Sequence, residues 1–253
     1  MDRFFAENLS ESDLALSAGE AHHATHVLRL RPGAEVELFD GTGRTAAGRI
    51  AKAARREVVV RVERVSPPAP RPRPIVHLAF AVPKGKRLDW LLEKATELAA
   101  ASLWPVKFKR SIAGGELTDA KRRRWQACCV SAAKQCGLNF LPEIRRPVGL
   151  DEFLAEMRGR ESLILLRGDN SPAASGIVDA LATSRGSSQS AIGNWQLEIV
   201  LLVGPEGGLT DGEKRACVEA GFRPVRIAQT TLRIETAAVA LLAAMAILGQ
   251  AGG

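Results

Sequence analysis

The stretch Glu198-Ile-Val-Leu-Leu-Val-Gly-Pro-Glu-Gly-Gly-Leu-Thr210 decides the fold class. Its branched apolar run, residues 199–203, predicts a strand that is buried on both faces, as in parallel sheets. Gly204-Pro205 ends this strand. Thr210 and Glu213 have the spacing of a capping box, so we expect a helix to start there. A buried strand that leads through a glycine loop into a helix is typical of α/β proteins.

The residues that follow extend this pattern. Gly221 suits the position just after a helix, and residues 224–227 are expected to form a second short strand. A helix should follow from Thr236, and its nearly continuous apolar sequence predicts that it is buried. Ligands of open α/β sheets bind outside the carboxyl ends of the strands, so residues 204–210 and 228–235 form a candidate site. The alternative is a tight turn and an ordinary connector.

Two motifs resemble the RsmE family of SPOUT-class RNA methyltransferases, which methylate N3 of a uridine in 16S ribosomal RNA. They are Gly204-Pro-Glu-Gly-Gly-Leu209 and Leu232-Arg-Ile-Glu-Thr-Ala237. The resemblance covers nearly the whole chain, because Lys84-Gly-Lys-Arg87, Gln135-Cys-Gly137 and Pro142-Glu-Ile144 are also similar. It implies an α/β fold with a C-terminal trefoil-knot domain and an N-terminal PUA-like β-barrel.

The N-terminal part has the pattern of a small β-rich module. A helix is expected over residues 21–30, behind a capping box at Ser17, and strands over 35–39, 44–52 and 57–65. A proline-rich stretch, residues 66–74, predicts an extended linker. We therefore expect a PUA-like RNA-binding barrel at residues 1–70 and a SPOUT methyltransferase domain at residues 75–253.

The second domain should alternate strands and helices. Strands are expected at residues 75–82, from 103 and at 163–166, and helices from Leu88 and after Thr118. Residues 183–193 are rich in Ser and Gly and predict a flexible surface loop.

Charge is distributed unevenly along the 253 residues, whose net charge is +7. Residues 71–146 carry sixteen Lys or Arg against six Asp or Glu, whereas residues 1–70 carry ten of each. A basic middle third fits a polyanion such as RNA, although an Arg-rich solvated surface is the alternative. We expect no membrane span and no signal peptide, and therefore a cytoplasmic protein.

Cysteines and histidines give no metal pattern. The four cysteines lack zinc spacing, which favours free thiols in a reducing compartment. His22 and His26 are four residues apart, but no third ligand is evident, so packing on the barrel or contact with RNA is favoured over a metal site.

Cofactor chemistry is indicated by the resemblance alone, because the dinucleotide fingerprint and the phosphate loop are both absent. The resemblance implies that backbone groups of three loops hold S-adenosylmethionine. The candidate cofactor-binding residues are Leu166, Arg167, Leu202, Gly204, Pro205, Glu206, Gly207, Gly208, Ile227, Ala228 and Leu232.

Uracil N3 carries a proton and is weakly nucleophilic until that proton leaves, so catalysis needs positioning and stabilisation of an anion. Arg233 is the first candidate for stabilising that anion. Glu206 or Glu235 would accept the proton or orient the base. Glu235 is equally well placed in the sequence to be a helix-capping carboxylate.

The expected partners are 16S ribosomal RNA or the small ribosomal subunit, and a second copy of the chain. The homodimer would form through the C-terminal domain, with the helix from Thr236 burying part of the interface. The candidate RNA-binding residues are Arg3, His22, His26, Arg29, Lys84, Lys86, Arg87 and Arg110.

The sequence departs from the family pattern at several positions. The family usually has glycine at Ala228, arginine at Thr230 and Leu138, threonine at Ile234 and glutamate at Lys134. These departures leave two alternatives to uridine-N3 methylation. One is a related RNA methyltransferase that acts on another nucleotide, and the other is a ribosome-assembly RNA-binding factor whose cofactor site has decayed.

Overall fold

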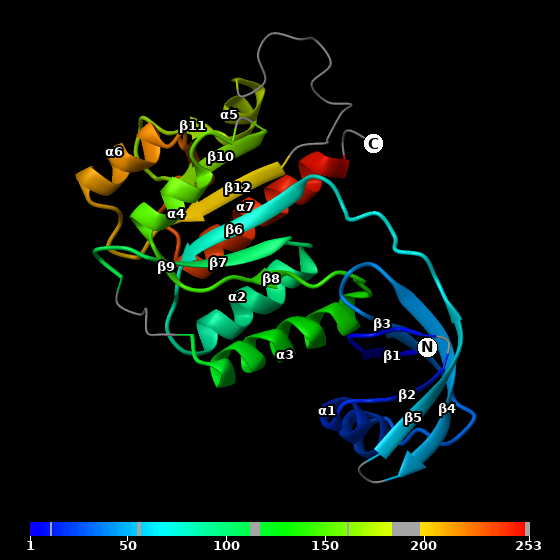
Figure 1. Cartoon of the computed structure of the whole chain (residues 1–253). Coiled ribbons are helices and arrows are strands. Elements are labelled where there is room, and N and C mark those ends of the chain that lie inside the picture. The colour runs from blue at the N-terminus through cyan, green and yellow to red at the C-terminus, as the bar shows by residue number, and fades with distance from the viewer. Residues whose placement is uncertain (11, 55–56, 112–116, 161, 184–197, 251–253) are drawn as a thin grey trace. The chain divides into compact units, whose positions relative to one another are not determined.

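The computed structural model describes residues 1–10, 12–54, 57–111, 117–160, 162–183 and 198–250 (Figure 1). Two compact units are present. The first contains residues 1–71 and 130–141, and the second contains residues 72–129 and 142–253. The break at residues 71 and 72 falls in the proline-rich stretch. The inclusion of residues 130–141 in the first unit was not indicated by their order in the chain.

The first unit is built on a five-stranded sheet with the order β1-β3-β4-β5-β2. The strands are β1 (Asp2–Phe5), β2 (Asp13–Ala15), β3 (Glu35–Phe39), β4 (Thr45–Ala54) and β5 (Glu57–Val65). The three strands predicted here are confirmed. Val58, Val60 and Val62 of β5 are buried, because alternate residues of a strand point to one face.

The predicted helix at residues 21–30 is shorter and begins earlier. Helix α1 spans Ala18–His22 and continues into a π-helical turn, η1 (His23–Val27). Ser17 starts α1, and its side-chain oxygen accepts a hydrogen bond from the backbone N–H of Glu20 at 3.4 Å. The Glu20 carboxylate does not complete a capping box but pairs with Lys134 Nζ at 2.6 Å.

The second unit contains an eight-stranded sheet in which every strand pair is parallel. Its order is β11-β13-β10-β12-β6-β7-β8, and β9 also pairs with β7. The strands are β6 (Ile75–Ala81), β7 (Ser102–Lys107), β8 (Glu143–Ile144), β9 (Val148–Gly149), β10 (Leu163–Gly168), β11 (Ser175–Gly176), β12 (Glu198–Val203) and β13 (Arg223–Arg226). The strands predicted at 75–82, from 103, at 163–166, 199–203 and 224–227 are confirmed to within two residues. The carboxyl ends of all these strands meet at one edge.

Helices cover both faces of this sheet. The described helices after β6 are α2 (Lys86–Glu97), α3 (Asp119–Cys136), α4 (Leu150–Met157), α5 (Ile177–Thr183), α6 (Asp211–Glu219) and α7 (Ile234–Gln250). A side chain added at Gly168 of β10 would meet Leu241 of α7, whereas Leu165 of β10 lies beside Gly221 at the end of α6. Positions 165 and 168 point to opposite faces, so α7 and α6 lie on opposite sides of the sheet.

The core under α4 is aromatic. Phe153 is fully buried, and its ring centroid lies 5.6 Å from that of Trp104 and 6.0 Å from that of Phe222. Helix α7 is buried along one side only: Leu241 is fully buried, whereas Ile247 is 67% exposed. The predicted burial of this helix is therefore confirmed for one side of it, and the other side is not buried within the chain.

The described residues test two further expectations only in part. None of the described helices is long and apolar enough to cross a membrane. Of the loop predicted at residues 183–193, residue 183 ends α5 and the rest lies outside the described residues.

Candidate active site

Three loops that follow neighbouring strands form the centre of the candidate site. Strands β13, β10 and β12 are adjacent in the sheet, so the loops that begin at residues 227, 169 and 204 leave the same edge. The amide of Asn170 donates a hydrogen bond to Thr231 Oγ1 at 2.8 Å, which joins two of the loops directly. Ligands of parallel α/β sheets bind at this edge.

The glycine loop after β12 needs its glycines for its own conformation. Gly208 has a φ of +67°, which favours glycine, and its N–H donates to Pro205 O at 2.8 Å. A side chain at Gly204 would overlap Leu209. The guanidinium of Arg110 donates to Gly207 O at 2.9 Å, so the segment after β7 holds this loop.

Glu213 fixes the same loop from the first turn of α6. The predicted capping box is confirmed, because Glu213 Oε2 accepts from the N–H of Thr210 at 2.8 Å and Glu213 N–H donates to Thr210 Oγ1 at 3.3 Å. Glu213 Oε1 also accepts from the backbone N–H of Lys109 at 2.8 Å. Burial alone would raise the pKa of the Glu213 carboxyl, but these hydrogen bonds outweigh burial and lower it.

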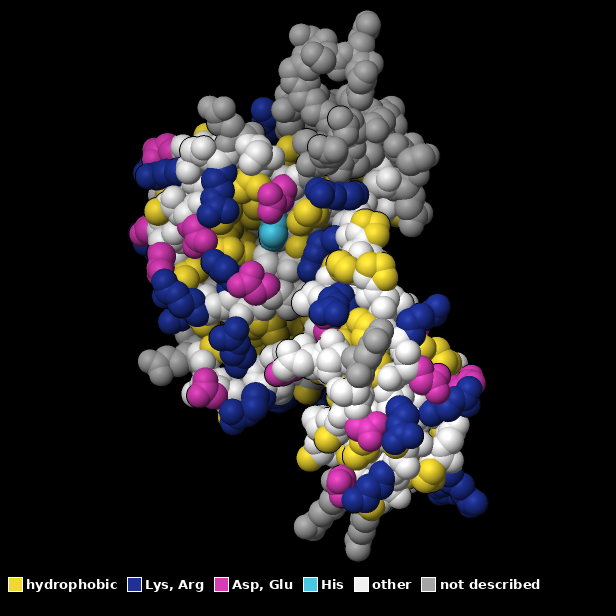
Figure 2. Space-filling model, turned by 45° about the vertical axis from the view of Figure 1, so that its right-hand side comes forward, with side chains coloured by type: hydrophobic (Ala, Val, Ile, Leu, Met, Phe, Trp, Pro, Cys, Tyr) yellow, Lys and Arg dark blue, Asp and Glu magenta, His cyan; other side chains and the backbone are white. Residues whose placement is uncertain are grey.

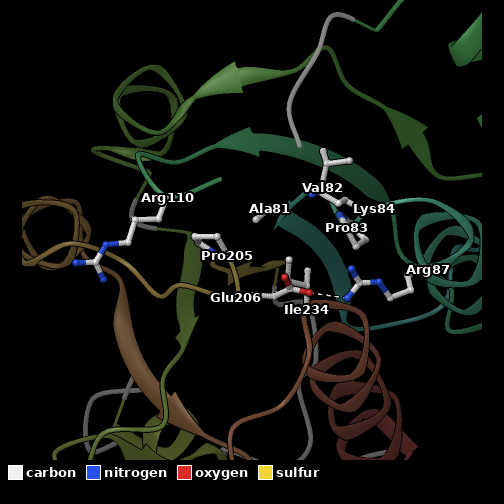
Figure 3. Close-up of a pocket in the computed structure, with 9 residues that line it drawn as sticks. All are labelled: Ala81, Val82, Pro83, Lys84, Arg87, Arg110, Pro205, Glu206 and Ile234. Carbon is white, nitrogen blue, oxygen red and sulfur yellow. Dashed lines mark hydrogen bonds and ion pairs between the residues drawn. The ribbon is translucent and has the colours of Figure 1, made fainter. Parts of the chain in front are cut away.

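A pocket opens between β6, the glycine loop and the start of α7 (Figure 3). Its lining residues are Ala81, Val82, Pro83, Lys84, Arg87, Arg110, Pro205, Glu206 and Ile234. Arg87 reaches from α2 toward the glycine loop and the start of α7. Its Nη1 lies 2.5 Å from Glu206 Oε1 and 3.9 Å from Glu235 Oε1. One guanidinium therefore holds two of the predicted catalytic carboxylates.

Glu235 and Arg233 differ sharply in environment. The side chain of Glu235 is 8% exposed, and its Oε2 is buried with no hydrogen-bond partner in the described chain. Arg233 is exposed, and its carbonyl accepts from the N–H of Ala237 at 2.9 Å. The unpartnered Glu235 Oε2 favours contact with a ligand over helix capping, since a capping oxygen accepts a backbone N–H.

Arg167 supports the loop after β10. Its side chain is 5% exposed, and its Nη2 pairs with Asp169 Oδ2 at 2.7 Å. Asp169 also accepts the backbone N–H of Ser171 at 2.8 Å and donates its own to Val225 O at 2.8 Å. Burial opposes ionisation of Asp169, but the Ser171 and Arg167 contacts together lower its pKa. Arg167 Nε is buried without a partner in the described residues.

The remaining cofactor candidates lie on the same three segments. Leu166 and Leu202 are fully buried strand residues that bring the backbone to the edge of the sheet. Ile227, Ala228 and Leu232 are half-buried in the loop between β13 and α7. The cofactor-binding candidates on β10, on β12, in the glycine loop and in the loop after β13 thus come together at one edge of the sheet.

The RNA-binding candidates are dispersed. Lys84 and Lys86 are exposed beside the pocket, and Arg87 and Arg110 make the contacts given above. In the first unit, Arg29 is exposed, as are His22 and His26, whose rings stack at 4.3 Å.

Arg3 is engaged in the first unit. Its Nε pairs with Glu37 at 2.7 Å, and its guanidinium also donates to Asn139 and to Ala133 O. Lys134, where the family has glutamate, lies 5.0 Å from the centroid of the Phe4 ring in addition to its pair with Glu20. No group of three metal-ligating side chains occurs in the described part of the chain.

Comparison with known proteins places the chain in a family. A family model described as an RNA methyltransferase domain matches residues 70–246, and one described as an RNA methyltransferase PUA domain matches residues 16–63. A ribosomal RNA small subunit methyltransferase E from Mycobacterium bovis is 31% identical, over 97% of this chain and 91% of its own length. The chain belongs to the RsmE family. The Synechocystis protein of the same name is 30% identical, over 94% of this chain and 74% of its own length.

Solved structures agree with this assignment. Ribosomal RNA small subunit methyltransferase E from Neisseria gonorrhoeae, bound to S-adenosyl methionine, gives a TM-score of 0.81 at 30% identity and covers 98% of both chains. A Legionella pneumophila protein solved with bound SAM gives 0.83 at 30% identity, over 99% of this chain and 98% of its own. The predicted fold class, an α/β protein with an N-terminal PUA domain and a C-terminal methyltransferase domain, is confirmed.

Sequence reasoning missed two features of the site. It identified Glu213 as a helix cap but not its bond to Lys109, because nothing in the sequence links residues 104 positions apart. It also missed the bond between Asn170 and Thr231, two short polar residues without a local pattern.

Proposed function

We propose that the chain transfers a methyl group from S-adenosylmethionine to N3 of a uridine in 16S ribosomal RNA. The observation that carries the proposal is the meeting of residues 204–209 and 232–237 at the carboxyl edge of the sheet in a member of the RsmE family. The S-adenosylmethionine bound to the Neisseria gonorrhoeae and Legionella pneumophila proteins supports the choice of cofactor.

The cofactor would be held by backbone groups of residues 166–167, 204–208 and 227–232. Buried polar atoms without partners fit such a ligand, since burial without a hydrogen bond is costly. One of them, Arg167 Nε, belongs to β10 at this edge. When bound, the sulfonium supplies an activated methyl group, so the protein's task is to prepare the acceptor.

We assign removal of the uracil N3 proton to Glu235. The Glu206 side chain is 38% exposed and pairs tightly with Arg87, at 2.5 Å, whereas Glu235 Oε2 is buried and has no partner among the described residues. A general base must have an oxygen free to take the proton. Arg87 would hold both carboxylates in place, and the exposed Arg233 would stabilise the negative charge that develops on the base.

The remaining elements of the proposal concern topology and partners. We propose that the C-terminal domain is knotted and forms a homodimer, with the exposed side of α7 in the interface. Ile247, at 67% exposure, is an apolar side chain that such an interface would cover. The RNA partner would be 16S ribosomal RNA within the small subunit, met by the exposed cations beside the pocket, and the protein would act in the cytoplasm.

A methyl-transfer assay tests the proposal. Purified protein is incubated with labelled S-adenosylmethionine and unmethylated small subunits, and the RNA is digested to nucleosides. We expect label in 3-methyluridine. Label in another nucleoside would point to a related methyltransferase with a different target. The departures from the family pattern at Thr230 and Leu138 are the reason for testing this alternative. Absence of both label and cofactor binding would favour an assembly factor with a decayed site.

Arg233→Ala and Glu235→Gln test the assigned roles. Each should lower kcat by roughly 100-fold or more, because removal of an electrostatic or acid–base group typically costs that much. Cofactor affinity, measured by calorimetry, should change little. Arg215→Ala, which removes an exposed arginine of α6 outside the site, is the control and should keep its kcat. Unchanged turnover in either test variant would contradict the role given to that residue.

A further inference from the structure

Exposed basic residues lie on two helices of the second unit. Lys84 and Lys86 stand at the start of α2, and Arg122 and Arg123 stand in the first turns of α3. These four side chains are exposed and make no ion pair with any described residue. Trp90 on α2, one turn after Lys86, is 41% exposed. We call this group of five residues the basic edge.

Contacts between the two helices bring the group together. Arg124 of α3 hydrogen-bonds to the Asp89 carboxylate of α2. Cys128 Sγ donates to Asp89 O at 3.4 Å. Figure 1 shows α2 and α3 side by side. The first turn of α2 and the first turns of α3 therefore lie at the same end of the helix pair.

That end is also the end that carries the pocket. Helix α2 begins five residues after β6, so its first turn stands at the carboxyl edge of the sheet. Lys84 and Arg87, on either side of this start, line the pocket. The basic edge therefore meets the pocket at Lys84, which belongs to both. From there the basic edge extends away from the pocket over α3.

We propose that the basic edge binds the phosphate backbone and one base of single-stranded RNA next to the nucleotide in the pocket. The inference rests on the proposed function in taking RNA as the substrate. Lys86 and Trp90 are four residues apart on one face of a helix, so a phosphate and a stacked base fit the same segment. Arg122 and Arg123 supply further phosphate contacts.

The charge pattern favours RNA over a protein partner. Asp89, the acid between the two helices, is already paired with Arg124, and Asp119 is an exposed acid at the start of α3. Figure 2 shows a face of the protein on which Lys and Arg side chains are interleaved with Asp and Glu. Unpaired cations beside an exposed tryptophan are typical of single-strand binding, which combines charge with stacking.

The test measures RNA binding separately from methyl transfer. The probe is a fluorescein-labelled single-stranded oligoribonucleotide of mixed sequence, titrated between 50 and 200 mM KCl, roughly the range over which salt dependence is informative. Arg122→Ala/Arg123→Ala should reduce the slope of log K against log salt by about 1.4, since each phosphate contact on a single strand contributes about 0.7. Trp90→Ala should weaken binding roughly tenfold and leave the slope unchanged.

A matched double variant controls for loss of charge. Arg158 and Arg160 are exposed and lie between α4 and the start of β10, which is the opposite edge of the sheet. Arg158→Ala/Arg160→Ala removes the same charge and should leave the slope within error. An unchanged slope in Arg122→Ala/Arg123→Ala, or an equal loss in the control, would overturn the proposal. Equal melting temperatures would establish that the variants are folded.

Turnover then separates this inference from the proposed function. With small subunits as substrate, Arg122→Ala/Arg123→Ala should raise KM several-fold and leave kcat unchanged. If no RNA is methylated but the salt slope falls as expected, the surface stands and the proposed function fails. If methylation proceeds with an unchanged KM and slope, the proposed function stands and the basic edge is rejected.

Discussion

Replacement of Glu213 by glutamine should loosen the glycine loop, although the two side chains have nearly the same size. The carboxylate accepts hydrogen bonds from the N–H of Lys109 at 2.8 Å, from the N–H of Thr210 at 2.8 Å and from Thr210 Oγ1 at 2.9 Å. The residue is 6% exposed. A glutamine amide has one accepting oxygen, so its NH₂ group must face at least one backbone donor.

The magnitude follows from these contacts. A buried donor left without a partner costs about 1–3 kcal/mol, and the remaining bonds lose the strength that the charge gives them. We expect Glu213→Gln to lower the free energy of unfolding by about 3 kcal/mol. For a unit of this size, each kcal/mol shifts Tm by about 2–4 °C, so Tm should fall by about 6–12 °C.

Thermal unfolding followed by circular dichroism measures this shift. Glu219→Gln is the control, because Glu219 is exposed at the other end of α6 and its replacement should change stability by less than about 0.5 kcal/mol. Affinity for S-adenosylmethionine should also fall in Glu213→Gln. A Tm within about 2 °C of the unsubstituted protein would refute the reasoning, because three buried bonds would then contribute almost nothing.

The same carboxyl predicts a dependence on pH. Its pKa in the folded protein is lowered from 4.5, so the stability it contributes is complete above that value and is lost as pH falls through the folded pKa. The difference in Tm between the unsubstituted protein and Glu213→Gln should therefore be constant near neutrality and shrink below about pH 4.5. A difference that persists unchanged into more acidic solution would contradict this assignment.

Two further predictions concern packing and thiol chemistry. Phe153→Ala should destabilise the second unit by about 3–5 kcal/mol, measured by urea unfolding, because the ring is fully buried between Trp104 and Phe222. In the native protein, Cys136 is exposed, whereas burial raises the pKa of Cys129 to about 12. Reaction with Ellman's reagent at pH 8 should therefore show a fast phase that Cys136→Ser abolishes and Cys129→Ser retains.

Features that are determined by residues close together in the sequence were predictable from it. The apolar run at residues 199–203 gave a buried parallel strand, and the spacing of Thr210 and Glu213 gave a capping box that the structure contains. The alternation of Val58, Val60 and Val62 likewise gave a strand with one buried face. In each case the physical cause of the structure acts within a few residues, so the pattern is local.

Features that depend on distant contacts were not predictable. Residues 130–141 pack with the first unit because Arg3 donates to Asn139 and to Ala133 O, across separations of 136 and 130 residues. The pair between Lys134 and Glu20 spans 114 residues. The capping residue Thr118 predicted a helix after it, and α3 confirms this, but a cap does not reveal what the second half of a helix packs against.

In the candidate site, the sequence identified the important residues, but their roles depend on contacts between distant residues. Sequence motifs singled out Arg87 as a phosphate contact and Glu206 and Glu235 as catalytic, and the structure joins all three through Arg87 Nη1. A guanidinium shared by two carboxylates carries no spare charge for a phosphate, so the charge that attracts RNA must come from other side chains. That requirement separates the role of Arg87, which orders the carboxylates in the pocket, from the role of the unpaired cations at the start of α2 and α3. If the pocket acts on a neutral base, as proposed, this division of roles explains how such a site can lie within a basic surface: the surface would bind the backbone, and the pocket would act on the base.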